Sequence, residues 1–374
     1  MKSLFYIVVM LMLLASCHSK PKTQGMGGSL KDSTYTQYAK GFKVTDCGAY
    51  KLIDVQDPTG ENDLTYHYAL VKRGEKVSDI PVEYKLIETP VKRVICMTAL
   101  QLSNFIKLKA VDRVVGMTST RFLFNEQMKE QLKNGKSSRI GIEGDFDTEL
   151  VMALQADLIL VSPFKRGGYE AIRNLDIPLV SFLGYKESSP LGQAEWIKFT
   201  ALLLGMEEEA NERFRQIEER YNYLKSLTLQ KTKRPTAMSG ELHSGNWYVV
   251  GGNSYLAQLF RDAGADYFMK NDNESGGFYL DFETVYSQGA ETDYWRIVNS
   301  YNGEYDYSVL EQTDSRYVDF ASFKNKKVIY CNLREKPFYE QTPVEPEVVL
   351  ADLIRIFHPD LLPGHAPVYY DLLK

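Results

Sequence analysis

Two glutamates occupy equivalent places in two similar segments of the chain, one in each half. Residues 146–163 read FDTELVMALQADLILVSP, in which Glu149 opens a short apolar-periodic helix and an aspartate leads into an apolar strand. Residues 279–300 read YLDFETVYSQGAETDYWRIVNS, in which Glu283 opens a similar helix ahead of a second strand. The helix dipole favours a carboxylate in the first turn, which explains either glutamate alone. The recurrence instead predicts two similar lobes that each present one carboxylate to a common partner.

The sequence lacks the patterns that support enzyme chemistry. It contains no Gly-x-Ser-x-Gly nucleophile elbow, no Walker A loop and no Gly-x-Gly-x-x-Gly dinucleotide fingerprint. Its five histidines are scattered and none lies near acidic residues or cysteines at metal-ligand spacing. We therefore expect no catalytic residue, no resident metal and no cofactor. His243 could ligate the metal of a ligand, although a polar loop residue is the simpler explanation.

The first 17 residues resemble the signal of a bacterial lipoprotein. Lys2 precedes a short apolar run, and the segment Leu-Ala-Ser ends at Cys17. This pattern predicts a signal peptide over residues 1–17, lipidation of Cys17 and a periplasm-facing, membrane-anchored protein of a Gram-negative bacterium. An ordinary secretory signal with an incidental cysteine is the alternative. Residues 18–37 are polar and rich in Gly, Lys and Ser, as is typical of a flexible tether.

Composition describes an ordinary globular protein with a mildly acidic balance. The chain has 374 residues, of which 44% are hydrophobic, and a formal net charge of −5. The length favours two lobes, and the absence of a basic stripe argues against nucleic acid as a partner. Cys96 and Cys331 lie in apolar runs, where a thiol behaves as a small buried hydrophobe, so no disulfide is expected.

The elements that would position these residues follow one another in a clear order. Alternating segments over residues 38–90 predict several short strands with turns, a small β extension. Over residues 91–190, continuous apolar strands alternate with helices, which is typical of a parallel α/β lobe. Residues 191–230 predict a long linking helix, with Ala210, Phe214, Ile217, Tyr221 and Leu224 on one apolar face. The α/β alternation then restarts and continues over residues 231–374.

With those elements in place, the chain resembles the periplasmic binding proteins of iron-siderophore, haem and cobalamin ABC importers. The segments that carry the resemblance are VDRVVGMTS, RIGIEGDFDTELVMALQADLIL, WIKFTALLLGMEEEANERF, GGNSYLAQLFRDAGA and LDFETV. The resemblance covers about three quarters of the chain and leaves out the β extension. It implies an α/β fold of two Rossmann-like lobes joined by a long rigid helix, with a ligand in the cleft between them.

The resemblance also assigns roles to residues. In such proteins a glutamate on each lobe docks against arginines of the permease, and Glu149 and Glu283 fall on that motif. Loops after the strand ends would wall the cleft, and they are rich in aromatic residues and arginine, which suit flat or anionic ligands. The candidate ligand-binding residues are Arg121, Phe122, Phe164, Lys165, Arg166, Tyr185, His243, Trp247, Tyr279, Arg334, Phe338 and Tyr339.

The sequence therefore predicts a lipid-anchored, monomeric binding protein of an ABC importer. It would capture a metal chelate (a ferric siderophore, haem or cobalamin) and deliver it to an inner-membrane permease. The alternative is a lipoprotein without a transport role, a recognition module for carbohydrate or another envelope component. An adhesion module has no use for two similarly placed carboxylates, so Glu149 and Glu283 favour the importer.

Overall fold

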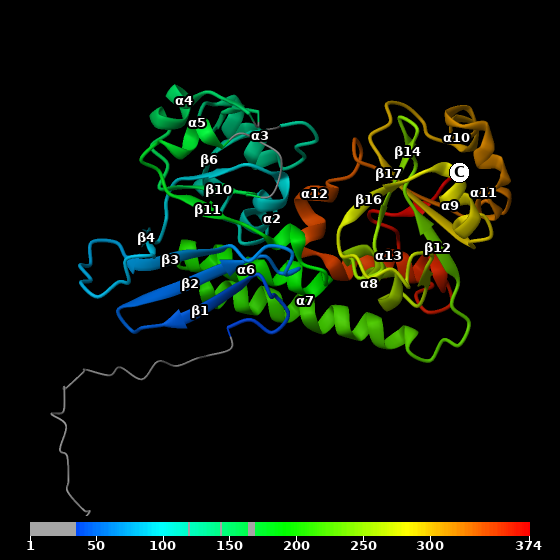
Figure 1. Cartoon of the computed structure of the whole chain (residues 1–374), viewed down its shortest axis with the longest axis horizontal. Helices are drawn as coiled ribbons and strands as arrows, with labels where there is room; N and C mark the ends of the chain where they lie inside the picture. The colour runs from blue at the N-terminus through cyan, green and yellow to red at the C-terminus, as the bar shows by residue number, and fades with distance from the viewer. Residues whose placement is uncertain (1–34, 119, 143, 164–168) are drawn as a thin grey trace, which may run out of the picture.

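The computed structural model describes residues 35–118, 120–142, 144–163 and 169–374. Within these residues the body has two lobes that lie side by side, each built around a five-stranded sheet (Figure 1). Strands covered by helices on both faces must be apolar on both sides, which is why continuous apolar runs form the inner strands. The two-lobed α/β architecture expected from the sequence is confirmed.

The described strands of the first-lobe sheet run parallel in the order β11-β10-β5-β6-β7. They are β5 Val94–Cys96, β6 Val114–Met117, β7 Ser138–Arg139, β10 Leu158–Val161 and β11 Leu179–Ser181. The lobe also contains α2 Ala99–Lys107, η1 Val111–Arg113, α3 Glu126–Lys133, β8 Gly141–Ile142, β9 Asp145–Phe146, α4 Thr148–Ala153, α5 Glu170–Arg173 and η2 Gly184–Lys186. Every residue of β5 and β10 is buried, as their apolar sequences predict.

The second-lobe sheet has the order β15-β12-β17-β18-β19 and is parallel except at the edge strand β19. Its strands are β12 Thr236–Ser239, β15 Asp266–Tyr267, β17 Tyr294–Asn299, β18 Val328–Asn332 and β19 Asp371–Leu372. A smaller antiparallel sheet comprises β13 Leu242–His243, β14 Asn246–Val250 and β16 Gly277–Leu280. The helices include α8 Tyr255–Asp262, α9 Phe282–Gly289, α10 Tyr307–Thr313, η3 Ser315–Asp319 and α11 Ala321–Lys324. Figure 1 shows the small sheet on the side of this lobe that faces the first lobe.

The β extension is a four-stranded sheet that packs on the first lobe. Its strands are β1 Phe42–Asp46, β2 Tyr50–Gln56, β3 Thr65–Lys72 and β4 Lys85–Thr89, in the order β1-β2-β3-β4. The ring of Phe42 lies 4.9 Å from that of Trp196, and the Trp196 indole donates a hydrogen bond to Glu187. Glu187 also accepts from the backbone of Lys40 and Gly41, so a buried carboxylate ties the start of the extension to the lobe.

Two helices, not one, carry the chain from the first-lobe sheet to the second. We expected a single linking helix over residues 191–230, but the structure has α6 Pro190–Leu204 and α7 Glu207–Thr228. Gly205 separates them in the left-handed conformation at φ 69°, which glycine adopts without strain and which ends the first helix. The predicted apolar face of α7 is confirmed as buried.

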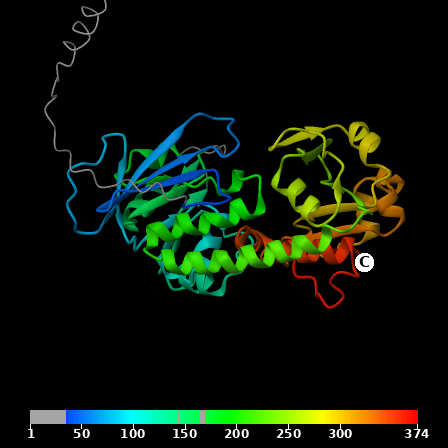
Figure 2. The same cartoon turned by 90° about the horizontal axis from the view of Figure 1, so that it is seen from below.

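Helix α7 contacts elements of both lobes. It packs against α6 on one side and against α13 (Pro346–Phe357) on the other. Figure 2 shows it running from beneath the first lobe towards the second. The Tyr221 hydroxyl donates to a buried carboxylate of Asp262 at 2.8 Å, which attaches α7 to the end of α8.

A late segment of the chain returns to the first lobe, although residues 231–374 were expected to form the second lobe alone. Helix α12 (Phe338–Gln341) and η4 (Thr342–Val344) pack against α2. The buried Glu340 accepts hydrogen bonds from the backbone N–H groups of Phe124 and Asn125 at 2.7 and 2.9 Å. The lobes are therefore joined both by the α6–α7 crossing and by this return.

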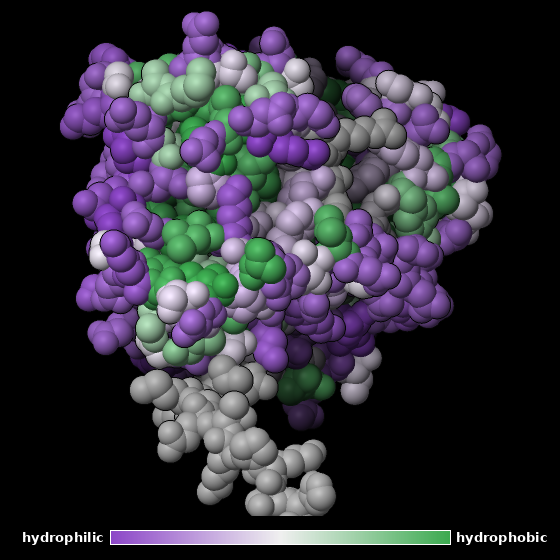
Figure 3. All heavy atoms as spheres, turned by 60° about the vertical axis from the view of Figure 1, so that its left-hand side comes forward, coloured by the Kyte–Doolittle hydropathy of each residue, from purple (hydrophilic) through white to green (hydrophobic). Residues whose placement is uncertain are grey.

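The surface is mostly polar on the side of the extension and the first lobe. Figure 3 shows hydrophilic residues surrounding smaller groups of apolar ones on that face. The extension contributes Leu64, Val82 and Leu86 to the exposed apolar surface. No described helix combines the length and the apolar character that a bilayer span requires.

Candidate ligand cleft between the lobes

A cavity of about 540 Å³ lies between the two lobes. Leu100 of α2, Tyr185 of η2 and Gln193 of α6 line it from the first lobe. Every other described lining residue comes from positions 239–370 in the second half of the chain. The volume is within the range of sites that enclose a small organic ligand.

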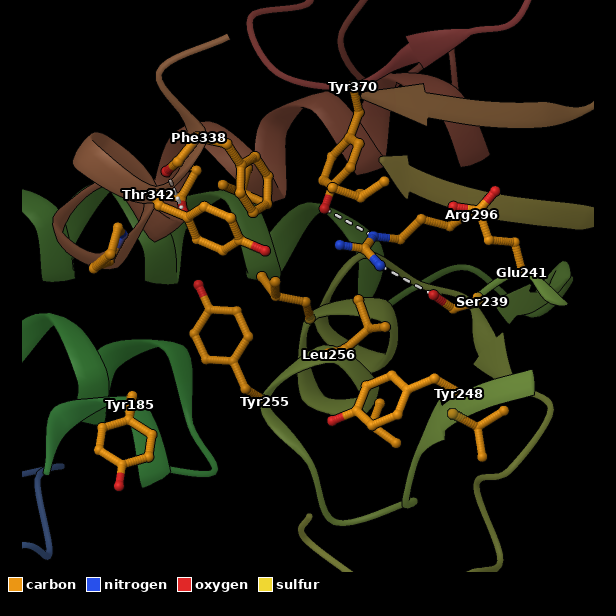
Figure 4. Close-up of a pocket in the computed structure, with 18 of the residues that line it drawn as sticks. Tyr185, Ser239, Glu241, Tyr248, Tyr255, Leu256, Arg296, Phe338, Thr342 and Tyr370 are labelled. Atoms are coloured by element: carbon orange, nitrogen blue, oxygen red, sulfur yellow. Dashed lines mark hydrogen bonds between the residues drawn. The ribbon is translucent and has the colours of Figure 1, made fainter. Parts of the chain in front are cut away.

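Tyrosine is the residue type that dominates the wall of this cavity. The tyrosines that line it are Tyr185, Tyr248, Tyr255, Tyr279, Tyr339 and Tyr370. Figure 4 shows side chains from several separate elements converging on one space. Partial burial in the cavity wall raises the pKa of Tyr248 and Tyr339 further above its usual value, and these phenols are protonated hydrogen-bond donors at neutral pH.

The small antiparallel sheet presents a pair of tyrosine rings to the cavity. Tyr248 on β14 and Tyr279 on β16 are opposite each other in the register, and their ring centroids are 5.4 Å apart in an edge-on arrangement. A β-carbon at Gly277 would overlap the ring of Tyr248, so glycine is required there for the ring to lie across the strand. Both residues are substantially exposed, at 48% and 67%, and are thus available to a ligand.

Arg296 on β17 is a cation that lines the cavity. Its Nε donates to the Tyr370 hydroxyl at 2.8 Å, and one terminal nitrogen donates to Ser239 Oγ at 3.0 Å. The guanidinium also lies 5.1 Å from the centroid of the Tyr370 ring. These contacts hold the guanidinium in one orientation, with its second terminal nitrogen toward the open space in Figure 4.

Glu241 contributes a carboxyl group to the same wall. Burial raises its pKa, and the hydrogen bond from the Asn299 amide at 3.3 Å partly offsets that effect. A carboxyl with a raised pKa spends more of its time protonated, and therefore neutral, than an exposed glutamate does.

Five of the predicted ligand-binding residues line the cavity. They are Tyr185, His243, Tyr279, Phe338 and Tyr339. They come from four separate parts of the chain: η2, β13, β16 and α12. The structure thus brings together residues that are up to 154 positions apart, a separation that follows from positions 185 and 339.

Trp247 is a correction to the predicted set. Its side chain is completely buried, packed against Trp295 and Phe320 in the core of the second lobe, and its indole N–H donates to the Ser239 carbonyl. Strand alternation places it on the opposite side of β14 from Tyr248, which is why the neighbouring residue reaches the cavity instead. A ligand in the cleft cannot touch Trp247.

Arg121, Phe122 and Arg334 come together, but outside the cavity lining. Both guanidinium groups lie over the ring of Phe122, at 4.7 and 5.7 Å from its centroid. Phe122 has a positive φ of 61°, a conformation that costs energy for a bulky residue. Since Arg334 belongs to the second lobe and Phe122 to the first, this cluster is a contact between the lobes.

Four predicted residues lie outside the described residues. Phe164, Lys165 and Arg166 were predicted to bind ligand, and Cys17 to carry the lipid. They remain predictions.

Glu149 and Glu283 have closely similar surroundings. Each is exposed and occupies the second position of a short helix, α4 and α9 respectively. An aspartate caps each helix: Asp147 accepts from the backbone of Leu150 at 2.9 Å, and Asp281 from that of Thr284 at 2.6 Å. The local structure therefore repeats in both lobes, as the recurring sequence predicts.

Several cavity residues were missed by sequence reasoning, above all Arg296, Ser239 and Tyr370. Arg296 is the one charged residue in an otherwise uncharged strand, YWRIVN, which resembles an ordinary buried strand with a tolerated cation. A signal did exist for Ser239, because it ends β12, and ligands of open α/β sheets bind at the carboxyl ends of strands. Tyr370 follows the last helix and carried no sequence signal.

Comparison with known proteins gives the family. A family model described as periplasmic binding protein matches residues 94–334. An uncharacterised lipoprotein of Methanocaldococcus jannaschii is 25% identical over 313 residues, which is 79% of this chain and 71% of the relative. A periplasmic binding protein from Veillonella parvula has the same fold, with a TM-score of 0.61 at 13% identity over 83% of this chain and 99% of that one.

A second solved structure agrees. A protein of an ABC-type Fe³⁺-hydroxamate transport system from Saccharomonospora viridis has a TM-score of 0.57 at 15% identity over 73% of this chain and 95% of that one. At these identities the solved structures show the fold alone. The family match spans well over half of the chain and excludes only the extension and the two ends. The chain therefore belongs to the periplasmic binding protein family.

Proposed function

We propose that this protein is a lipid-anchored component of an ABC importer that captures a metal chelate between its lobes and delivers it to an inner-membrane permease. The chelate is a ferric siderophore, haem or cobalamin. The observation that carries the proposal is the tyrosine-rich cavity between two lobes of the periplasmic-binding-protein fold. Flat chelating groups and macrocycles present large conjugated faces, and aromatic walls bind such faces well.

The delivery step rests on the two capped glutamates. A permease with two-fold symmetry would meet one carboxylate from each lobe, and arginine–carboxylate pairs fix register as well as affinity. Glu149 and Glu283 are both exposed at matching positions, which is the arrangement that this partner requires. Anchoring through Cys17 would keep the protein near the membrane, and the Methanocaldococcus relative is itself described as a lipoprotein.

Calorimetric titration of the mature chain tests the capture step directly. We would use a Cys17→Ser form to prevent lipidation and titrate it with haemin, cyanocobalamin and a panel of ferric siderophores. Fluorescence alone is a poor reporter of contact, because Trp196, Trp247 and Trp295 are all completely buried. Submicromolar, saturable binding of one chelate supports the proposal and names the cargo.

The site needs a matched control for this titration. Tyr248→Ala removes a lining ring, whereas Tyr223→Ala removes an exposed ring of α7 outside the cavity. We expect the first substitution to weaken binding and the second to leave it unchanged. If no chelate binds the parent protein, the metal-chelate proposal fails, and a carbohydrate panel becomes the next test.

A further inference from the structure

Arg296 has no counter-ion among the described residues, although a partly buried cation normally has one. Its hydrogen bonds go to two neutral oxygens, the Tyr370 hydroxyl and Ser239 Oγ. Among the described residues no carboxylate forms a salt bridge with it, and no group accepts from its second terminal nitrogen. The side chain is only partly exposed, and it lines the cavity.

A guanidinium in this position needs an anion from elsewhere. Arginine stays protonated in proteins, so the charge cannot be relieved by losing a proton. Removing a charge from water without pairing it is costly, and a neutral hydroxyl compensates less than a carboxylate does. Glu241, the carboxyl group of the same wall, hydrogen-bonds to Asn299 instead. A ligand in the cavity would therefore have to supply the anion that pairs with Arg296.

The rings around Arg296 define the rest of the ligand. The edge-on pair of Tyr248 and Tyr279 offers exposed aromatic surface, and Tyr339 adds a third exposed ring. Such rings favour a flat, conjugated molecule, whereas they offer little to a flexible, highly hydrated one. The fork of an arginine matches the two oxygens of a carboxylate or a similar planar oxyanion.

We infer that Arg296 anchors one oxyanion of the ligand, and that the cleft binds planar aromatic or conjugated molecules that carry a carboxylate-type group. This inference rests on the proposed function, because it names the ligand class of the same cleft. Such an anchor would let the cleft distinguish between chelates of similar size by the presence of one anionic group. An anionic planar ligand binds, and the same ligand with that group neutralised binds much more weakly.

A matched pair of probes tests the inference without knowledge of the natural cargo. The probes are 2,3-dihydroxybenzoate and 2,3-dihydroxybenzamide, which share the ring and differ in the charged group. We would measure their dissociation constants by calorimetry on the mature Cys17→Ser chain, and the shift in melting temperature at saturating probe. The parent protein should bind the acid roughly tenfold or more tightly than the amide, as the loss of one charge-assisted hydrogen-bonding group predicts.

Substitutions then locate the anchor. Arg296→Gln should remove the preference for the acid, and Arg296→Lys, which keeps the charge without the fork, should retain part of it. Arg355→Gln is the control, because Arg355 lies on α13 outside the cavity lining and should leave the preference unchanged. If Arg296→Gln does not fold, the lysine variant and Tyr370→Phe, which keeps the ring but removes the acceptor of the Arg296 Nε–H, provide the same comparison.

The possible outcomes separate this inference from the broader proposal. Equal binding of acid and amide, binding of neither probe, or an acid preference that survives in Arg296→Gln would overturn the inference. The chelate panel is an independent result. If a chelate binds the parent and the Arg296→Gln protein equally well, the importer proposal stands and the anchor is wrong. If the acid preference depends on Arg296 but no chelate binds, the anchor stands and the metal-chelate cargo is wrong.

Discussion

The two lobes repeat the turn that bears the exposed glutamate but contribute very unequally to the cleft. In both lobes a capping aspartate precedes the glutamate by two positions, and a completely buried valine, Val151 or Val285, follows it two positions later. The cavity, in contrast, receives three described residues from the first lobe and all its others from positions 239–370, of which four belong to α12 and η4, the segment that returns to the first lobe. Repetition is expected where a symmetric partner binds, and asymmetry where a single small molecule binds.

The repetition itself is imperfect at the charged groups. Glu283 lies 3.6 Å from a guanidinium nitrogen of Arg316, which also sits 3.8 Å from the Phe282 ring centroid. No such ion pair involves Glu149 among the described residues. The carboxylate of the second lobe is therefore partly compensated by Arg316, whereas no described residue compensates that of the first lobe. The comparison can be tested at each of these points.

Charge reversal of the glutamates should have the largest effect. Glu149→Lys or Glu283→Lys should each lower permease-dependent uptake at least roughly 30-fold, since breaking a close charge pair at an interface costs about 2–5 kcal/mol. Ligand binding should stay unchanged. The measurement is transport into vesicles that contain the permease. Glu126→Lys is the control, because Glu126 is also an exposed first-turn glutamate, on α3, without a counterpart in the second lobe. Normal uptake by the double variant contradicts the docking role.

A second prediction concerns the junction that holds the unequal lobes together. Glu347 at the start of α13 is partly buried, and one of its carboxylate oxygens is buried with no hydrogen-bond partner among the described residues. Burial raises its pKa from 4.5 to about 7, an effect that nearby Lys107 partly offsets. Because the folded pKa exceeds the unfolded one, the folded state favours the protonated form. The contribution is fully present below pH 4.5 and is lost as the pH rises through about 7.

Glu347→Gln should therefore stabilise the protein at pH 8 and change it little at pH 4.5. We expect the free energy of unfolding at pH 8 to rise by about 1–3 kcal/mol. This is less than the full pKa shift of Glu347 implies, because the side chain is partly solvated. Urea denaturation of both proteins at the two pH values measures the difference. An equal gain at both pH values would mean that charge burial at the junction is not the cause.

The unequal cleft predicts unequal losses on ring removal. Tyr248→Ala should weaken ligand binding roughly five- to tenfold, because its ring forms part of the exposed pair on the second lobe. Tyr185→Ala, on the first lobe, should weaken it about twofold. Calorimetry with any bound chelate or with 2,3-dihydroxybenzoate provides the numbers. A larger loss for Tyr185→Ala would show that the first lobe contributes more than its share of the wall indicates.

The smallest effect is expected at Arg316. Arg316→Gln removes the cation that partly compensates Glu283 and should strengthen docking to the permease about twofold, since exposed ion pairs contribute little. Affinity for the permease at low and moderate salt is the measurement. The gain should disappear in a Glu283→Gln background. A gain that persists there would have another origin.

Much of the fold follows from local sequence patterns. Some features can be predicted because burial and periodicity act over a few residues. They are the apolar runs that become β5 and β10, the buried face of α7, and the buried thiols of Cys96 and Cys331. The break at Gly205 was readable too, since a glycine after a helical run commonly ends a helix. The prediction of a single linking helix did not take this glycine into account.

The cavity was harder to predict because it depends on contacts that are distant in sequence. Five of the predicted residues line the cavity, yet the neighbours Trp247 and Tyr248 differ: Trp247 is buried in the core and Tyr248 lines the cavity, because they lie on opposite sides of β14. The position of α12 against α2 has no local signal, because it depends on Glu340 meeting the backbone of a loop 215 residues away. Arg296 was missed since its charge becomes meaningful only once its neighbours are known to be neutral.

The attachment of the extension to α6 fixes the point from which the protein would hang. The Glu195 carboxylate accepts hydrogen bonds from the backbone N–H groups of residues 37–39, which fixes the start of the extension to α6. With the lipid on Cys17 as proposed, about 18 residues separate the membrane from the first described residue. Fully extended, 18 residues span at most roughly 60 Å. A tether of that length would keep the protein within that distance of the bilayer. Its effective concentration at a permease would then be set mainly by lateral diffusion, and lobes of modest affinity would still meet their partner often.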